Sequence, residues 1–293
     1  MAFSGAYTAL ITPFKNSEVD HKALSELVER QIDGKIDGLV PCGTTGESAT
    51  LTEQERLAVI KTVVDQARGR VPIIAGTGSN DTAKSIAFTK AVSEIKGVDA
   101  ALVVAPYYNK PGQRGLVLHF EAIANASPLP LVLYNVPGRT VISLSAPTVA
   151  TLAKHPNIVA IKEASADMVL GTDILSTVPG DFDVLSGDDF TTLPLVCLGG
   201  KGCISVVSNL APTLMHDLVQ AGLNSDLKTA RELHQKVVPF AKILFSDSNP
   251  VPTKAGAALL GWCSDEARLP LYSPDEALKE RVAQGLKELG LLS

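Results

Sequence analysis

The sequence predicts an α/β fold, a (β/α)8 TIM barrel followed by a C-terminal helical appendage. Short apolar runs alternate with helical segments along most of the chain. Hydrophobic residues make up 45% of the chain and aromatic residues only 5%, so the core is aliphatic, like the layered interior of such a barrel. A chain of 293 residues is long enough for a barrel and an added helical part.

Eight apolar runs are candidates for parallel strands: residues 6–12, 38–42, 71–75, 100–105, 129–134, 157–162, 182–186 and 202–205. Successive ends lie roughly 19 to 33 residues apart, which leaves room for a loop, a helix and the next strand. Eight such right-handed units favour closure into a barrel. An open doubly wound sheet is the alternative, but it would more usually show fewer strands and a nucleotide-binding loop.

The helical segments fit this alternation. Residues 21–31 are apolar at the helical period, with Asp20 as the expected N-cap, and Thr52 and Glu55 form a capping-box pattern before the next helix. Further helices are expected at residues 81–95, 115–126, 188–198 and 211–221. Helices at residues 226–245, 252–260 and 274–291 follow with no intervening strand. We therefore predict a barrel, residues 1–224, that carries the active site, and a helical domain, residues 225–293, that shields one side or forms a subunit contact.

Composition excludes several classes of protein. The net charge is −5 and no long basic run occurs, which argues against nucleic acid as a partner. No apolar window reaches the length of a membrane span, and the N-terminus lacks the pattern of a signal peptide, so we expect a cytoplasmic protein. The cysteines show no metal-ligand spacing, so we predict no metal site and four buried thiols in a reducing cytosol: Cys42, Cys197, Cys203 and Cys263.

Lys162 ends the sixth candidate strand, at the edge of a barrel where active sites form. Burial there disfavours the charged ammonium and makes the neutral amine available as a nucleophile for a carbonyl group. The alternative is a strand-end lysine that reaches water or pairs with Glu163. For a single lysine this alternative is the better interpretation. The residues at the other strand ends therefore decide whether Lys162 is a nucleophile.

Those strand ends carry hydroxyl and guanidinium groups: Thr44 and Thr45 after the second strand, Tyr107 and Tyr108 after the fourth, and Tyr134 and Arg139 after the fifth. Paired threonines can bind a carboxylate, a phenol can transfer protons, and an arginine can fork two donors onto a carboxylate. Each group has an alternative interpretation when it is taken singly. The threonine pair can belong to an ordinary turn, the tyrosine can be structural, and the arginine can lie on the surface. Together with Lys162, the set is what a Schiff-base enzyme needs.

Nearly the whole chain resembles the dihydrodipicolinate synthase family of pyruvate-dependent, class I aldolase-like lyases. The resemblance is carried by residues 10–13, 43–50, 74–78, 106–111, 134–140, 161–164, 185–188, 202–206 and 268–270. The position of Arg139, in Pro-Gly-Arg-Thr, is the most specific to the synthases. The resemblance implies condensation of pyruvate with L-aspartate-4-semialdehyde to 4-hydroxy-tetrahydrodipicolinate, the first committed step of lysine and diaminopimelate biosynthesis.

The resemblance also implies roles for individual residues. Lys162 forms the imine with pyruvate, and no metal or organic cofactor is required. Tyr134, Thr44 and Tyr108 form a proton relay, in which Tyr108 comes from a neighbouring subunit. Substrate-binding roles fall to Thr45 for the pyruvate carboxylate, Arg139 for the semialdehyde carboxylate, and Gly187 and Ile204 for the pocket wall. A relay that crosses an interface implies a tight dimer, and the family usually assembles as a homotetramer.

A regulatory lysine site at the dimer interface matches less well. Its positions in lysine-inhibited members correspond to Ser48, Ala49, Glu53, Arg56, Asn80, Lys84 and Tyr107. Glu53 and Arg56 depart from the histidines common there, and Lys84 replaces a carboxylate expected to face the ammonium of the ligand. Added cations beside a cationic ligand weaken binding, so we expect weak or absent inhibition by lysine.

Two other functions are weighed against this one. Another pyruvate lyase of the same fold, such as N-acetylneuraminate lyase or a keto-deoxy-sugar-acid aldolase, is the alternative enzyme. Arg139 and the threonine pair argue against the neuraminate enzyme. A barrel retained only for binding would leave Lys162 and its companions at the strand ends without a use.

Overall fold

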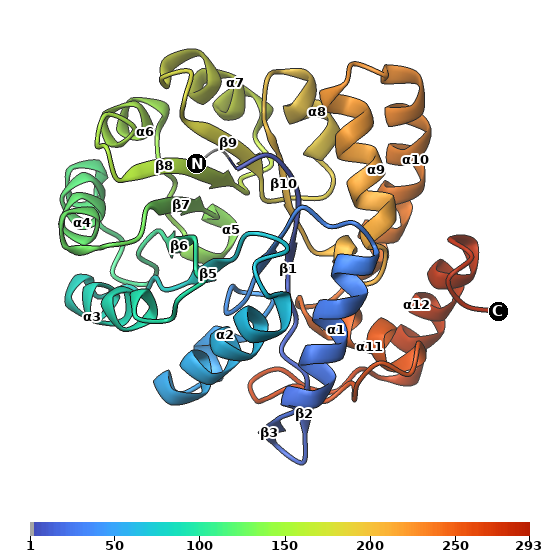
Figure 1. Ribbon diagram of the computed structural model, residues 1–293. Helices are drawn as coiled ribbons and strands as arrows, with labels where there is room; N and C mark the ends of the chain where they lie inside the picture. Colours follow the sequence, from blue (N-terminus) through green and yellow to red (C-terminus); the bar gives the residue numbers. More distant parts are fainter. Residues whose placement is uncertain (1–2) are drawn as a thin grey trace.

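The computed structural model describes residues 3–293, in which eight parallel strands form one sheet (Figure 1). The strands are β1 (Gly5–Ala9), β4 (Gly38–Val40), β5 (Ile74–Gly76), β6 (Ala100–Val104), β7 (Leu131–Asn135), β8 (Ile158–Glu163), β9 (Asp183–Ser186) and β10 (Gly202–Ser205). Their order is β4-β1-β10-β9-β8-β7-β6-β5. A parallel bridge between Leu39 and Ile73 joins the two outermost strands and closes the ring. The predicted barrel is confirmed.

Helices follow the strands and lie around the outside of the sheet (Figure 1). They are α1 (His21–Asp33), α2 (Glu53–Ala67), α3 (Thr82–Ser93), α4 (Gln113–Ala126), α6 (Ala146–Leu152), α7 (Met168–Thr177), α8 (Thr192–Cys197) and α9 (Pro212–Leu223). Both predicted caps are confirmed: the Asp20 side chain accepts from the amide of Ala23, and Thr52 and Glu55 form a capping box. Across residues 3–293, every helix is too short or too polar to cross a membrane.

Element ends differ from the prediction where side chains take over the hydrogen bonds. β1 stops at Ala9 because the amide of Ile11 donates to the Asn209 side chain instead of to a strand (3.0 Å). α8 starts at Thr192, four residues later than predicted, because a turn held by Ser186 Oγ on the carbonyl of Asp188 (2.7 Å) comes first. The short elements β2 (Phe14–Lys15), β3 (Glu18–Val19), η1 (Ser48–Thr50), α5 (Pro137–Thr140) and η2 (Val207–Asn209) were not predicted.

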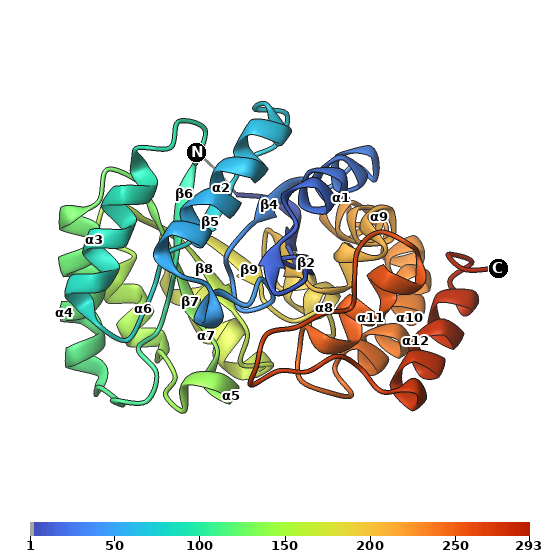
Figure 2. The ribbon, with the colours of Figure 1, turned by 90° about the horizontal axis from the view of Figure 1, so that it is seen from below.

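Three helices follow the barrel: α10 (Leu227–Leu244), α11 (Val251–Leu259) and α12 (Glu276–Glu288). They lie together on one side of the molecule, next to α1 and α9 (Figure 2). Residues 251–257 of α11 are all buried, so this helix is a core element and not a surface cover. The division at residue 224 stays a prediction.

The core has two layers, one inside the barrel and one between the strands and the helices. On β8, Ala160 packs inside with Leu102 and Val132, whereas Ile161 packs outside with residues of α4 and α6. Because successive strand residues point to opposite faces, Lys162 shares the inner face with Ala160. The fold therefore directs the lysine into the barrel mouth.

The prediction of four buried thiols is wrong for Cys197, which is exposed. It occupies the last position of α8, whose contacts with the core are made by Leu193, Leu195 and Val196. Cys42 and Cys203 are buried, Cys263 is half-buried, and all four thiols are free.

Candidate active site

Lys162 and Tyr134 lie side by side, because β7 and β8 pair in a register that matches the two residues. The Lys162 side chain is shielded from water, with the residue only 5% exposed. Its Nζ lies 4.4 Å from the centroid of the Tyr134 ring. Contact between an amine and an aromatic face holds the nitrogen at a fixed place in the barrel mouth.

The alternative that Lys162 pairs with Glu163 is wrong, because Glu163 faces the other side of the strand. The lysine is also largely buried, with the residue 5% exposed. The Glu163 carboxylate accepts from Asn135 Nδ2 (2.8 Å) and from the amide of Ser165 (2.6 Å). Burial raises the pKa of Glu163. Within residues 3–293, no ion pair involves Lys162, so its amine is not committed to a carboxylate.

Gly187, after β9, makes room for the lysine side chain. A Cβ added at this position would lie 2.9 Å from Lys162 Cε and Cγ and 2.6 Å from the Cβ of Ala164. Any larger residue would therefore push the amine from its place. The lack of a side chain at Gly187 therefore leaves room for Lys162. This role was not part of the prediction, which placed Gly187 in the pocket wall.

Two cavities open at the barrel mouth, and Lys162 lines neither of them. The larger, about 410 Å³, is lined by Thr44, Arg139 and Tyr107 among others. The smaller, about 40 Å³, is lined by Thr44 and Tyr134. Thr44 therefore lines both, between the tyrosine on one side and the arginine on the other. Arg139 is exposed on α5, where Pro137 starts the helix.

Thr45 is buried and contacts a segment far away in the chain. Its Oγ1 accepts from Nδ2 of Asn249, at 2.9 Å. Asn249 lies between α10 and α11, and its main-chain oxygen also accepts from Arg139 Nη2, at 3.5 Å. Sequence reasoning did not find Asn249. An asparagine-proline pair directly before a buried helix is the only local signal.

Glu47, two residues after Thr45, forms a buried ion pair with Lys254 of α11. The residue has a positive φ of 53°, which the turn after the threonine pair requires. The Lys254 side chain is fully buried, donates to the carbonyl of Glu266 (2.7 Å) and lies 4.0 Å from the centroid of the Phe14 ring. Burial lowers the pKa of Lys254. Lys254 was not identified from the sequence either, although a single charged residue within an apolar helix indicates a buried ion pair.

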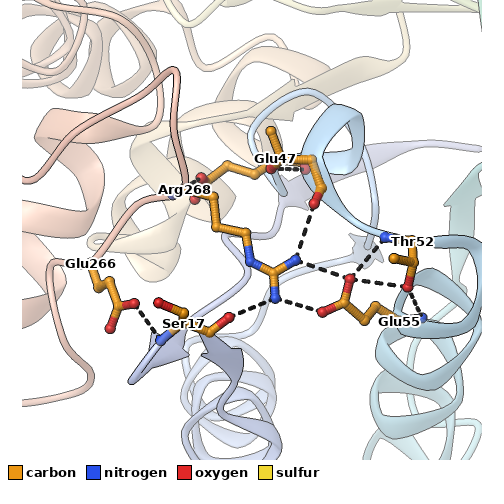
Figure 3. A network of polar contacts seen from close by, with 7 residues as sticks. Ser17, Glu47, Thr52, Glu55, Glu266 and Arg268 are labelled. Atoms are coloured by element: carbon orange, nitrogen blue, oxygen red, sulfur yellow. Dashed lines mark hydrogen bonds and ion pairs between the residues drawn. The ribbon is translucent and has the colours of Figure 1, made fainter.

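A polar network extends this connection on the surface side (Figure 3). The Arg268 guanidinium bonds both oxygens of Glu55, at 2.9 and 2.5 Å, and the carbonyl of Ser17 at 2.8 Å. The amide of Arg268 donates to Glu47 Oε2, at 3.1 Å. The segment after α11 is therefore attached to the loop that carries Thr44 and Thr45.

Ile204, predicted as pocket wall, lies on the inner face of β10, level with Tyr7. The turn behind it is held by Asp189, which accepts from Ser205 Oγ (2.5 Å) and from the amide of Val206 (3.1 Å). Complete burial raises the pKa of Asp189 to about 6. The isoleucine is thus fixed from behind by a buried carboxyl group.

Tyr108 is the predicted relay residue that this chain does not bring to its own lysine. It is 89% exposed and has a φ of +71°, a strained value for a tyrosine. Neither of the two cavities at the barrel mouth includes it in its lining.

Only some residues of the predicted regulatory lysine site lie around one cavity. Ser48, Ala49 and Tyr107 line the larger cavity, together with Arg56. Asn80 and Lys84 do not line it, and Lys84 is exposed in the first turn of α3.

Among the described residues, no three histidine, cysteine, aspartate or glutamate side chains are grouped as a metal site. A model of the Dihydrodipicolinate synthetase family matches residues 2–289. A 4-hydroxy-tetrahydrodipicolinate synthase of Magnetococcus marinus is 50% identical over 290 residues, 99% of each chain.

Two solved structures have the same architecture. The dihydrodipicolinate synthase of Thermotoga maritima superposes with a TM-score of 0.98 at 40% identity, and the match covers all of both chains. The chloride-inhibited dihydrodipicolinate synthase of Acinetobacter baumannii, solved with pyruvate, superposes with a TM-score of 0.96 at 43% identity over 99% of each chain.

Proposed function

The chain belongs to the dihydrodipicolinate synthetase family and has 4-hydroxy-tetrahydrodipicolinate synthase activity in lysine biosynthesis, and from this premise we propose how its residues divide the reaction. Lys162 Nζ attacks the keto carbon of pyruvate, and loss of water gives an imine. The observation that carries this proposal is the buried, unpaired amine of Lys162 against the Tyr134 ring. The amine of a lysine is the nucleophile that imine formation needs.

The imine then activates the methyl carbon of pyruvate. Loss of a proton from that carbon gives an enamine, which forms a carbon–carbon bond with the aldehyde carbon of aspartate-4-semialdehyde. Attack of the semialdehyde's own amino group on the imine carbon closes the ring and releases the Lys162 amine. The imine nitrogen serves as the electron sink throughout, so we propose that no metal or organic cofactor takes part.

Hydroxyl groups at the barrel mouth move the protons in this proposal. Tyr134 exchanges protons with the imine and with the reacting oxygen, because it lies next to Lys162. Thr44 continues the relay, supported by the small cavity that it shares with Tyr134. Tyr108 of a neighbouring subunit completes it, which its exposure and strained backbone support.

Carboxylates are bound by two further residues in this proposal. Thr45 binds the carboxylate of pyruvate, and Arg139, at the edge of the larger cavity, binds that of the semialdehyde. Gly187 and Ile204 shape the wall on the other side of Lys162. We place the active site in the barrel, residues 1–224, with residues 225–293 as its helical domain, in a cytoplasmic homotetramer made of two tight dimers.

Borohydride reduction in the presence of pyruvate tests the nucleophile. We expect the reduced imine to add one pyruvate-derived group, which peptide mass mapping will find on Lys162. Reduction without pyruvate is the control. An adduct on any other lysine, or none at all, would remove the mechanism whichever aldehyde is the acceptor.

Subunit complementation tests the shared relay. Lys162→Ala and Tyr108→Phe are each expected to be nearly inactive alone, whereas a mixed dimer contains one site with both native groups. Random mixing should restore activity at about one site in four. Each variant mixed with itself is the control, and no recovery in the mixture would mean that Tyr108 does not serve a partner's site.

Weak inhibition by lysine is expected from the charges of Arg56, which lines the larger cavity, and of Lys84. The Arg56 guanidinium lies 3.8 Å from the centroid of the Phe88 ring and donates to the carbonyl of Gly76 (2.9 Å), so it stays in place. A cationic ligand near Arg56 and Lys84 loses about tenfold or more in affinity. Inhibition assays should give no low-micromolar inhibition constant, and Lys84→Glu should strengthen inhibition. Tight inhibition of the native enzyme would contradict this prediction.

A further inference from the structure

Asn249 connects the helical domain to both groups proposed to bind carboxylates. Its side-chain amide donates to Thr45 Oγ1 at 2.9 Å, and its main-chain oxygen accepts from Arg139 Nη2 at 3.5 Å. The residue is 7% exposed and its bond with Thr45 is buried, so water does not compete for that bond. A residue between α10 and α11 therefore reaches into the barrel mouth.

The bond to Thr45 fixes the direction in which the threonine hydroxyl can act. A hydroxyl has one hydrogen to donate and two lone pairs to accept with. Asn249 Nδ2 occupies a lone pair of Thr45 Oγ1. In residues 3–293, no hydrogen bond takes the hydrogen of this hydroxyl, so the hydroxyl is free to donate it.

We propose that Asn249 is a positioning residue that makes Thr45 a hydrogen-bond donor toward the carboxylate of pyruvate. The inference rests on the proposed role of Thr45 in binding that carboxylate. A donor aimed at an anion strengthens its binding, whereas a hydroxyl that donates to a protein acceptor has nothing left for the substrate. The polarity of residue 249 thus sets the affinity for pyruvate.

The surroundings of Asn249 hold it in place for this task. Pro250 follows directly and α11 begins at Val251, with a buried first half. From the same helix, Lys254 pairs with Glu47, two residues beyond Thr45. The segment thus holds the hydroxyl of Thr45 through Asn249 and the backbone after Thr45 through Glu47. The helical domain, expected to shield or to contact a subunit, completes the pyruvate site.

Asn249→Asp and Asn249→Ala separate polarity from simple packing. Aspartate replaces the donor with an acceptor and takes the Thr45 hydrogen, whereas alanine removes the bond without reversing it. We expect Asn249→Asp to raise the pyruvate concentration for half-maximal borohydride trapping about tenfold to a hundredfold, and Asn249→Ala clearly less. The KM for the semialdehyde should stay within about threefold, because the main-chain contact with Arg139 remains.

Repeating both changes in a Thr45→Val background tests whether Asn249 acts through Thr45. Without the hydroxyl, the two substitutions should change pyruvate trapping less than about twofold, as coupled residues do. Urea unfolding confirms that each variant is folded. If Asn249→Asp does not fold, Asn249→Leu replaces it, and its effect must also disappear in the Thr45→Val background.

Three results would overturn the inference. If Asn249→Asp traps pyruvate at the same half-maximal concentration as the native protein, Thr45 donates to residue 249 and not to pyruvate. Equal losses in Asn249→Asp and Asn249→Ala that persist in Thr45→Val would mean a purely structural role. Native trapping by Thr45→Val alone would reject the role of Thr45 as well, and so separates failure of the proposed function from failure of the inference.

Discussion

Replacing Lys162 with alanine is expected to abolish turnover and imine trapping while leaving the fold intact. No other amine can take its place at the end of β8, because the neighbouring inner-face groups are Tyr134 and Leu185. Loss of a covalent nucleophile lowers kcat by on the order of 10⁴-fold or more. A coupled assay with pyruvate and aspartate-4-semialdehyde measures turnover, and borohydride reduction followed by mass mapping measures the imine.

The stability of this variant should change little. Lys162 has no ion-pair partner among the described residues, so its removal leaves no opposite charge unpaired. The urea midpoint should therefore stay near that of the native protein. Lys162→Met, which keeps the volume of the side chain, is the matched control. Residual turnover above about one hundredth of native in both variants would show that another group forms the covalent intermediate.

The barrel is predictable from the sequence because its signal is repeated. Each apolar run ends near a loop, and one uncertain run does not change the pattern of the other seven. Strand ends are less predictable, since contacts such as that of the Ile11 amide with Asn209 come from the far end of the chain. No local pattern near residue 11 contains that information.

The site is predictable to the extent that it follows strand ends. Lys162 and Tyr134 end neighbouring strands, so the barrel alone brings them together. Asn249 and Lys254 contact Thr45 and Glu47 across about two hundred residues, and neither lies at a strand end. Only the packing of α11 against the loop reveals these contacts. Tyr108 is a different case, because its proposed partner lies in another subunit.

Replacing Lys254 with methionine is expected to cause the largest loss of stability of any single change considered. The methionine fills the same space but leaves the Glu47 carboxylate buried, and within residues 3–293 only the amide of Arg268 still donates to it (3.1 Å). Breaking a buried pair by removing one partner costs about 3–5 kcal/mol of unfolding free energy. Urea denaturation measures this loss, and pyruvate trapping should weaken as well, because Glu47 follows Thr45.

Two further variants isolate the buried charge as the cause. Lys254→Met combined with Glu47→Leu removes both charges and should recover most of the stability, since apolar pairs of similar volume often replace buried ion pairs without loss. Lys279→Met breaks the surface pair with Asp265 (3.1 Å) and should leave the urea midpoint nearly unchanged. If the double variant is no more stable than Lys254→Met alone, the loss comes from the contacts of Lys254 with Phe14 and Glu266 and not from an unpaired Glu47. Pyruvate trapping in the double variant then separates two roles of Glu47, in stability and in the position of Thr45. If stability recovers while trapping stays weak, the ion pair itself positions Thr45.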